Sequence, residues 1–485
     1  DFFTNASSHP NPRHFFGYTV LFLQKITGTH WYTILFLLKT TFITLIPPLI
    51  FLFIYGIVRD KIKNEFQNTI LNFFLFILIL YLIAGNTSLF AIAWWPPVFY
   101  MASSQTLSLF LFLIGSYFLF YIKSNVRYFY LLFWGASVTL HFTVGFSLLA
   151  LYLMSTIMNF RARQTLLVLV FCIGLPAAIN LFAFSQPTDV KLSAQAFIEI
   201  YVKLRHPSHY WFSQLGSLNS FPWYINYLFV ILLLIIPAIY FLYKREKAWV
   251  LVSVLFILSF SAAPFLQLFF TEIVPAKFPV AFGPTRFCFT GLWMVCILYS
   301  ILLMSVLGKI NLKFVHIPRV SVWISFPLIV FSITLAVIIA KDNPYEKYTL
   351  RDPEFYNWVQ NNTRPEEIFA SFEDDYVYLL PLIYKRAVFV ANGFPFTENF
   401  FLEYADRYTL LYGNYKILEH YQGSMNERYD HYYGDIDPDR LRHICAKYRL
   451  DYLVMRPGAG KNISGFAPVF QNEKVKIYKA ADIIK

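Results

Sequence analysis

Ten separate apolar stretches, each long enough or nearly long enough to cross a bilayer, dominate this sequence of 485 residues. A bilayer core about 30 Å thick requires roughly 20 helical residues, so the shorter stretches must be kinked or packed inside a bundle. We therefore expect an α-helical polytopic membrane bundle. The ten expected spans are 31–58, 69–84, 107–122, 128–140, 144–158, 165–184, 223–243, 249–269, 287–307 and 320–340.

The composition agrees with a membrane location. Hydrophobic residues make up 57% of the chain and charged residues only 14%, whereas a soluble domain has about 25% charged residues. The net charge of +12 could suggest nucleic acid, but the basic residues lie largely in short loops beside apolar runs, as cytoplasmic loops do. We expect the lipid bilayer as a partner and no nucleic acid. Three of the four cysteines lie in or beside spans, so neither a disulfide framework nor a cysteine-based metal site is predicted.

The basic loops also predict orientation. The loops 59–63, 123–127, 161–163, 244–247 and 309–319 all lie on one side of the membrane if residue 1 starts outside. This assignment places the loops 1–30, 85–106, 185–222 and 271–286 and the tail 341–485 on the extracytoplasmic side, and we expect a bacterial inner membrane. The chain begins with Asp1 rather than Met, which we interpret as a fragment. An additional first helix would raise the count from about ten spans to about eleven.

The segments at the two ends of the bundle have distinct characters. Residues 15–26 form an apolar stretch too short to span, which predicts an interfacial helix within an outer loop covering residues 1–30. The transmembrane bundle covers residues 31–340. Alternating helical and strand patterns in residues 341–485, among them an expected helix at 438–448 and an expected strand at 452–455, predict a soluble, extracytoplasmic α/β domain.

This layout resembles that of the polytopic GT-C membrane glycosyltransferases. They too have an acidic first outer loop with an interfacial helix, and often an α/β domain after the last span. The segment from Phe355 through Trp358 to Ala370 looks like the opening of such tails, as does the run from Tyr448 through Asp451 to Val454. The resemblance covers nearly the whole chain in architecture, and no short motif in it is diagnostic. It implies transfer of a sugar from a polyprenyl-phosphate carrier to an acceptor on the extracytoplasmic side, with inversion.

By this resemblance, Asp1 occupies the position of the catalytic base that activates the acceptor hydroxyl. The alternative is an ordinary polar loop residue, and no second acidic residue follows in residues 2–30. The same outer loop supplies Arg13 as a substrate-binding candidate. The resemblance also extends to His141, because many such chains carry a histidine in a comparable segment that faces the cavity. A satisfied structural histidine at a helix end is the other interpretation.

The phosphate of the donor requires positive charge or oriented hydrogen-bond donors. One basic and aromatic cluster in the loop 185–222 could supply them, and it consists of Lys203, Arg205, His206, His209 and Trp211. An interfacial anchor without a ligand explains this cluster equally well. Arg286 lies at the outer entrance of a span, where a charged group is costly unless it is paired or functional. Its side chain could also simply extend to the membrane surface.

A non-catalytic membrane protein, either a transporter or an accessory subunit of a membrane complex, remains the alternative function. Against transport, Lys39 is the only charged residue well inside an expected span, whereas ion-coupled carriers commonly place several near the midplane. The sequence does not predict a particular cofactor. Binding of a divalent metal ion is the alternative that it leaves open. The acceptor and the identity of the sugar are not specified by these residues.

Overall fold

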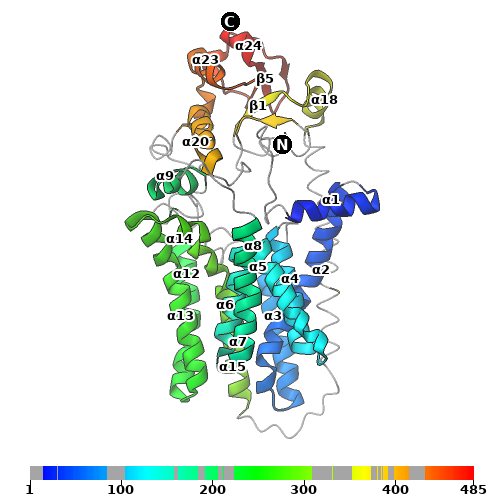
Figure 1. Ribbon diagram of the computed structural model, residues 1–485, viewed down its shortest axis with the longest axis vertical. Coiled ribbons are helices and arrows are strands. Elements are labelled where there is room, and N and C mark those ends of the chain that lie inside the picture. The colour runs from blue at the N-terminus through cyan, green and yellow to red at the C-terminus, as the bar shows by residue number, and fades with distance from the viewer. Residues whose placement is uncertain are drawn as a thin grey trace.

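The computed structural model describes residues 15–29, 31–84, 104–157, 162–183, 192–205, 211, 223–308, 330, 352–372, 380, 384, 386–390, 398–413 and 432–485. These residues are mostly helical. Figure 1 shows a bundle of long helices below a small C-terminal unit that contains a sheet. We call the end of the bundle beneath this unit the tail-side end.

The bundle is built from helices that run up and down between its two ends (Figure 1). They are α2 (Trp31–Val58), α3 (Glu65–Ala84), α4 (Ser104–Tyr121), α5 (Phe129–Leu140), α6 (Phe142–Ser155), α12 (Trp223–Tyr243), α13 (Lys247–Leu268) and α15 (Gly291–Leu307). One further helical segment of the bundle is made of three consecutive elements. They are α7 (Ala162–Val168), the π-helical segment η6 (Leu169–Gly174) and α8 (Leu175–Ala183).

Four of the helices in the described ranges are long and apolar enough to cross a membrane, by length and composition. They cover Thr33–Lys61, Ser104–Tyr121, Lys247–Ile273 and Pro284–Leu307. Shorter apolar helices occupy four further expected spans: Phe66–Ile77, Phe142–Ser155, Leu166–Ile179 and Tyr227–Tyr243. The expected span 320–340 lies outside the described residues apart from Val330. The helical, membrane-embedded character of the chain is thus confirmed, and the count of ten spans stays a prediction.

Close packing of α4 and α5 illustrates how the bundle is held together. Trp134 is fully buried, and its Nε1 donates to the carbonyl oxygen of Phe112 at 3.0 Å. A Cβ atom on Gly115 would lie only 2.6 Å from Cδ1 of Trp134. Ser108 and Ser137 hydrogen-bond across the same pair of helices at 2.9 Å. Small residues and satisfied polar groups therefore bring these helices together, as is common in membrane bundles.

The expected interfacial helix at residues 15–26 is present as α1 (Phe15–Thr27). Figure 1 shows that α1 lies across the direction of α2 rather than along it. Its exposed apolar side chains recur at helical spacing and are Tyr18, Leu21, Phe22 and Ile26. Such a stripe suits the surface of a membrane, and contact with the membrane stays a prediction.

The C-terminal unit contains a five-stranded sheet in the order β2-β1-β3-β5-β4. Its strands are β1 (Ile368–Ser371), β2 (Ala387–Val388), β3 (Tyr452–Met455), β4 (Phe470–Gln471) and β5 (Lys476–Lys479). Strand β1 pairs in parallel with β2 and β3, whereas β5 pairs antiparallel with β3 and β4. The accompanying helices are α18 (Pro353–Asn362), α20 (Glu398–Tyr412), α23 (Pro438–Lys447) and α24 (Ala480–Ile484). The small C-terminal sheet is as predicted, and its extracytoplasmic location stays a prediction.

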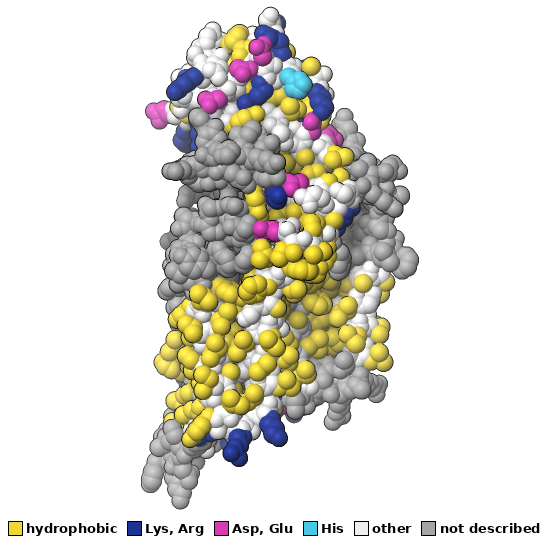
Figure 2. Space-filling view, turned by 90° about the vertical axis from the view of Figure 1, so that its left-hand side faces the viewer, with side chains coloured by type: hydrophobic (Ala, Val, Ile, Leu, Met, Phe, Trp, Pro, Cys, Tyr) yellow, Lys and Arg dark blue, Asp and Glu magenta, His cyan; other side chains and the backbone are white. Residues whose placement is uncertain are grey.

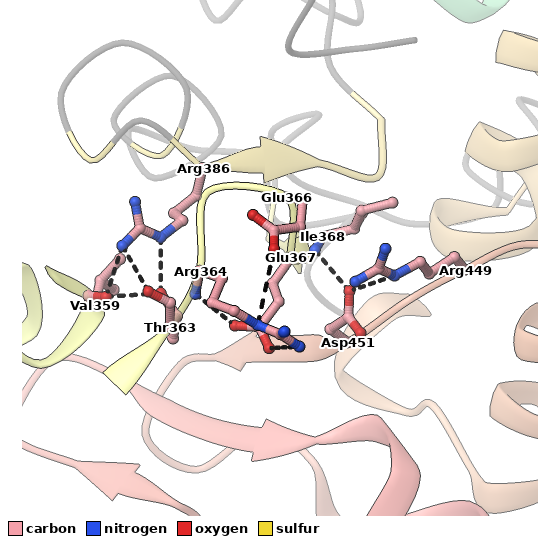
Figure 3. A network of polar contacts seen from close by, with 9 residues as sticks. All are labelled: Val359, Thr363, Arg364, Glu366, Glu367, Ile368, Arg386, Arg449 and Asp451. Atoms are coloured by element: carbon pink, nitrogen blue, oxygen red, sulfur yellow. Dashed lines mark hydrogen bonds and ion pairs between the residues drawn. The ribbon is translucent and has the colours of Figure 1, made fainter. Parts of the chain in front are cut away.

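A buried arginine joins α18 to the sheet (Figure 3). Arg386 is 4% exposed, and its guanidinium donates to the carbonyl oxygens of Val359 and Thr363 at 3.0 and 2.9 Å and to the hydroxyl of Thr363 at 2.7 Å. These carbonyls belong to the last turn of α18 and the residue after it. The carbonyl oxygen of Val359 also accepts from the backbone N–H and the hydroxyl of Thr363. Arg386 therefore adds a further donor to the end of this helix, where carbonyl oxygens lack their full set of intrahelical partners.

The surface of the molecule is divided by residue type. Figure 2 shows a broad apolar belt over the bundle, Lys and Arg below it, and charges of both signs over the C-terminal unit. An apolar belt of this extent would be an aggregation hazard in water and is suited to lipid.

Candidate functional site

The candidate site lies at the tail-side end of the bundle, where the start of α6 meets the segment that precedes α15. That segment consists of the short helix α14 (Lys277–Phe282) and the 3-10 helix η10 (Pro284–Thr290). Helix α6 packs on η10, which also packs on α13. Segments far apart in the sequence are thereby brought together beneath the C-terminal unit.

His141 lies at the break between α5 and α6. Its backbone has φ −147° and ψ 87°, outside the helical region, and its Nδ1 accepts a hydrogen bond from the backbone N–H of Val144 at 3.4 Å. The half-buried imidazole thus caps α6. The capping role supports the structural interpretation of His141, and it also fixes the ring at the tail-side end of the bundle.

Phe282 holds the start of α6 against the segment that carries Arg286. Its carbonyl oxygen accepts from the hydroxyl of Thr143 at 3.3 Å. Its ring contacts those of Phe142 and Phe146 edge-on, with centroids 5.1 and 5.3 Å apart. Phe282 is the last residue of α14, so these contacts place the first turns of α6 beside the entry to η10.

Arg286 is half-buried within η10. The chain enters this helix through Gly283, whose φ of +68° favours glycine, and Pro284 follows at the first helical position. The backbone N–H of Arg286 donates to the carbonyl oxygen of Gly283 at 2.9 Å. The neighbouring Thr285 is buried. Arg286 therefore lies on a short, well-defined element at the end of a span, as the sequence predicted.

The structure adds two buried polar residues that the sequence analysis missed. Gln267, at the end of α13, donates from Nε2 to the hydroxyl of Thr271 at 2.9 Å. Thr271 belongs to the π-helical segment η9 (Phe269–Ile273), which continues α13. The Oε1 atom of Gln267 is buried, and none of the described residues hydrogen-bonds to it. The available signal was a glutamine and a threonine four residues apart near the end of an apolar span.

The described part of the basic and aromatic cluster, Lys203 and Trp211, packs with the C-terminal unit. Lys203 belongs to the π-helical segment η7 (Glu199–Arg205), which follows α9 (Ala194–Ile198). Its Nζ lies 2.9 Å from Oε1 of Glu199 and 5.5 Å from the ring centroid of Trp211. Trp211 is 8% exposed and belongs to the same apolar core as the sheet. In this arrangement Lys203 and Trp211 help to attach the segment to the C-terminal unit.

The remaining candidates cannot be placed. Asp1, Arg13, His206 and His209 lie outside the described residues, and Arg205 is described only as the last residue of η7. Within the described ranges, no group of three or more His, Cys, Asp or Glu side chains is arranged to hold a metal ion. The described candidates at this end of the bundle are His141, Thr143 and Arg286. Gln267 and Thr271 lie at the end of α13 and in η9, and α13 packs on η10.

Comparison of the sequence with models of known protein families gives no match, and comparison with curated proteins gives none either. Only the residues of the site itself therefore indicate its chemistry.

Proposed function

We propose that this protein is a GT-C-type membrane glycosyltransferase, which moves a sugar from a polyprenyl-phosphate carrier to an acceptor on the extracytoplasmic side with inversion. The observation that supports the proposal most is the meeting of the His141 and Arg286 segments at the tail-side end of the bundle, joined by Phe282. A lipid-linked donor would enter from the membrane and present its phosphate at this level. The C-terminal unit would then contribute to holding the acceptor.

Each of the two residues has a chemical role in this proposal. The guanidinium of Arg286 can donate two hydrogen bonds to phosphate oxygens and stabilise the negative charge that develops as the sugar leaves. A neutral His141 that accepts at Nδ1 carries its proton on Nε2, and this N–H can donate to the same phosphate or to a sugar hydroxyl. Asp1 remains the proposed base, on the resemblance alone.

The sidedness of the proposal rests on the basic loops. If the short loops rich in Lys and Arg are cytoplasmic, the opposite end of the bundle and the C-terminal unit are extracytoplasmic. Figure 2 agrees with such a division, because Lys and Arg lie at the bottom of the apolar belt, away from the C-terminal unit.

Transfer of labelled sugar from polyprenyl phosphate by the purified protein tests the proposal, with wild type compared with Asp1→Asn. The amide keeps the size of the side chain and removes its basicity, so transfer should fall by on the order of 100-fold or more. Undiminished transfer by Asp1→Asn would remove Asp1 from the role of base.

An accessory subunit without catalytic activity is the second candidate, and the packing of Lys203 favours it. Its ammonium already contacts Glu199 and lies near the ring of Trp211, so this part of the cluster serves the fold. If wild-type protein transfers no sugar from any polyprenyl-phosphate donor but copurifies with other membrane proteins, this second function is preferred.

A further inference from the structure

The end of the bundle opposite the C-terminal unit carries a strongly basic surface. The basic residues there whose side chains the structure describes are Arg59, Lys61, Lys63, Lys123, Arg127, Lys244, Arg245 and Lys247. The acidic side chains described there are Asp60, whose Oδ1 lies 3.7 Å from Nε of Arg59, and Glu246, whose Oε1 accepts a hydrogen bond from Ser305. The surface is therefore positive, as the dark blue side chains at the bottom of Figure 2 show.

Several of these cations lie over aromatic rings. The Nζ of Lys61 is 5.5 Å from the ring centroid of Trp249, and the Nζ of Lys244 is 4.4 Å from that of Tyr243. The guanidinium carbons of Arg59 and Arg127 lie 5.8 and 5.1 Å from the rings of Tyr121 and Tyr128, respectively. Aromatic rings beside cations at the end of an apolar belt are typical of the level of the lipid headgroups.

Trp249 gives this surface a specific point of attachment. It is the third residue of α13, is only 9% exposed and belongs to the bundle core. Its Nε1–H is buried and has no hydrogen-bond partner among the residues that the structure describes. Leaving a buried donor unsatisfied costs about 1–3 kcal/mol. An external acceptor that reaches this N–H beside the flexible, exposed side chain of Lys61 would remove that cost.

We propose that Lys61 and Trp249 form a binding site for the phosphate of an anionic phospholipid headgroup. The phosphate oxygens accept from the ammonium of Lys61 and from the indole N–H of Trp249, and the surrounding lysines and arginines contribute long-range attraction. The acyl chains of the same lipid lie along the apolar belt. A free phosphate ion offers the same acceptor oxygens but lacks these apolar contacts. The site is independent of sugar transfer, because it lies at the other end of the bundle.

Native mass spectrometry of the full chain released from nanodiscs tests this site, with phosphatidylglycerol compared with phosphatidylcholine at equal total lipid. We expect several-fold more bound phosphatidylglycerol on wild-type protein. The double variant Lys61→Gln with Trp249→Phe should lose about fivefold or more of this preference, since one cation near a lipid surface is worth about that factor. The phenylalanine keeps an aromatic ring in the core and removes the N–H, although its ring is smaller than the indole.

The matched control is Lys461→Gln, which removes an exposed cation from the C-terminal unit and should leave the preference unchanged. The melting temperature of the double variant in phosphatidylcholine checks that the bundle still folds, because the smaller ring removes packing contacts while the unsatisfied N–H is gone. Equal binding of the two lipids by wild type, or an unchanged preference in the double variant, would overturn the proposal. Displacement of phosphatidylglycerol by millimolar inorganic phosphate at constant ionic strength would assign the site to the free ion instead.

Discussion

Arg386 is the residue on which the attachment of α18 to the sheet depends most. We expect Arg386→Met to lower the free energy of unfolding of the C-terminal unit by about 2–4 kcal/mol, because the carbonyl oxygen of Thr363 loses the donor that Arg386 supplies and that of Val359 loses one of its donors. Hydrogen exchange of the full chain, followed by mass spectrometry over β1 and α18, measures this loss as faster exchange. The side chain of Arg364 nearby is 72% exposed, so Arg364→Met should change exchange little. Equal exchange in the two variants would show that the buried network does not stabilise the unit.

Asp406 should make the stability of the C-terminal unit depend on acidity. Partial burial alone would raise the pKa of Asp406, but hydrogen bonds from Lys447 and Tyr448 and the charge of Lys447 hold it below its ordinary value of 3.8. The Oδ2 atom lies 2.7 Å from Nζ of Lys447 and 2.6 Å from the Tyr448 hydroxyl. A lowered pKa contributes stability above the ordinary value, and this contribution is lost as the pH falls through the lower native pKa.

Thermal unfolding between about pH 6 and pH 3 measures this dependence. The variant Asp406→Asn should be less stable than wild type near neutral pH, and the difference should shrink as the pH falls below 3.8. A difference that stays constant across the range would contradict the assignment to Asp406.

At the level of single residues, the sequence predicted some residues of the candidate site and missed others. His141 and Arg286 were identifiable because a titratable group beside an apolar run is unusual, and both lie at the expected end of the bundle. Gln267 and Thr271 were missed, since uncharged polar residues in apolar helices carry a weak signal until their burial is known. Lys203 was found, but its pairing with Glu199 depends on the helical geometry of η7, which its loop-like sequence did not indicate.

Helix α5 and the π-helical segment η6 pack so closely that a methyl group added at Gly135 should push their backbones apart. A Cβ atom on Gly135 would lie 2.7 Å from the carbonyl oxygen of Phe171. We expect Gly135→Ala to destabilise the bundle by about 1–3 kcal/mol, because backbone cannot move aside as a flexible side chain can. The melting temperature in detergent reports this change. Gly17→Ala is the control, because nothing lies within 4 Å of its added methyl group, and a melting temperature lowered equally by both changes would contradict the account.

The elements themselves were predictable to different degrees. The strand at residues 452–455 and the helix at residues 438–448 agree closely with β3 and α23, because a start signal and a change of periodicity mark each of them. The expected span at residues 165–184 is instead divided among α7, η6 and α8. A continuous apolar run contains no signal for a π-helical turn, so hydropathy alone could not predict this division.

The whole molecule should be oriented with its basic end in the cytoplasm and its C-terminal unit outside. Two exposed lysines report the two sides, Lys123 in the turn after α4 and Lys461 in the C-terminal unit. In a Cys445→Ser background, an impermeant maleimide should label Lys461→Cys in intact cells and Lys123→Cys only after permeabilisation. Three native cysteines are buried and should stay unlabelled. Labelling of Lys123→Cys in intact cells would reverse the proposed orientation.

The sequence predicted the overall architecture of the molecule more fully than it predicted the candidate site, and the architecture explains why. Apolar runs and basic loops follow the physics of the bilayer and can be read locally. The meeting of α6 with η10 depends on long-range contacts through Phe282, which no local pattern specifies. A site assembled from distant segments in this way becomes visible only in three dimensions.

The central claim is that the tail-side end of the bundle is a glycosyl-transfer site, and Arg286 tests it most directly. The measurement is the rate of sugar transfer from polyprenyl phosphate by Arg286→Gln relative to wild type, with Lys461→Gln as the control for surface charge. We predict a loss on the order of 100-fold for Arg286→Gln, since the leaving phosphate loses its cation, and a rate within about twofold of wild type for the control. Transfer by Arg286→Gln at the wild-type rate would contradict the claim.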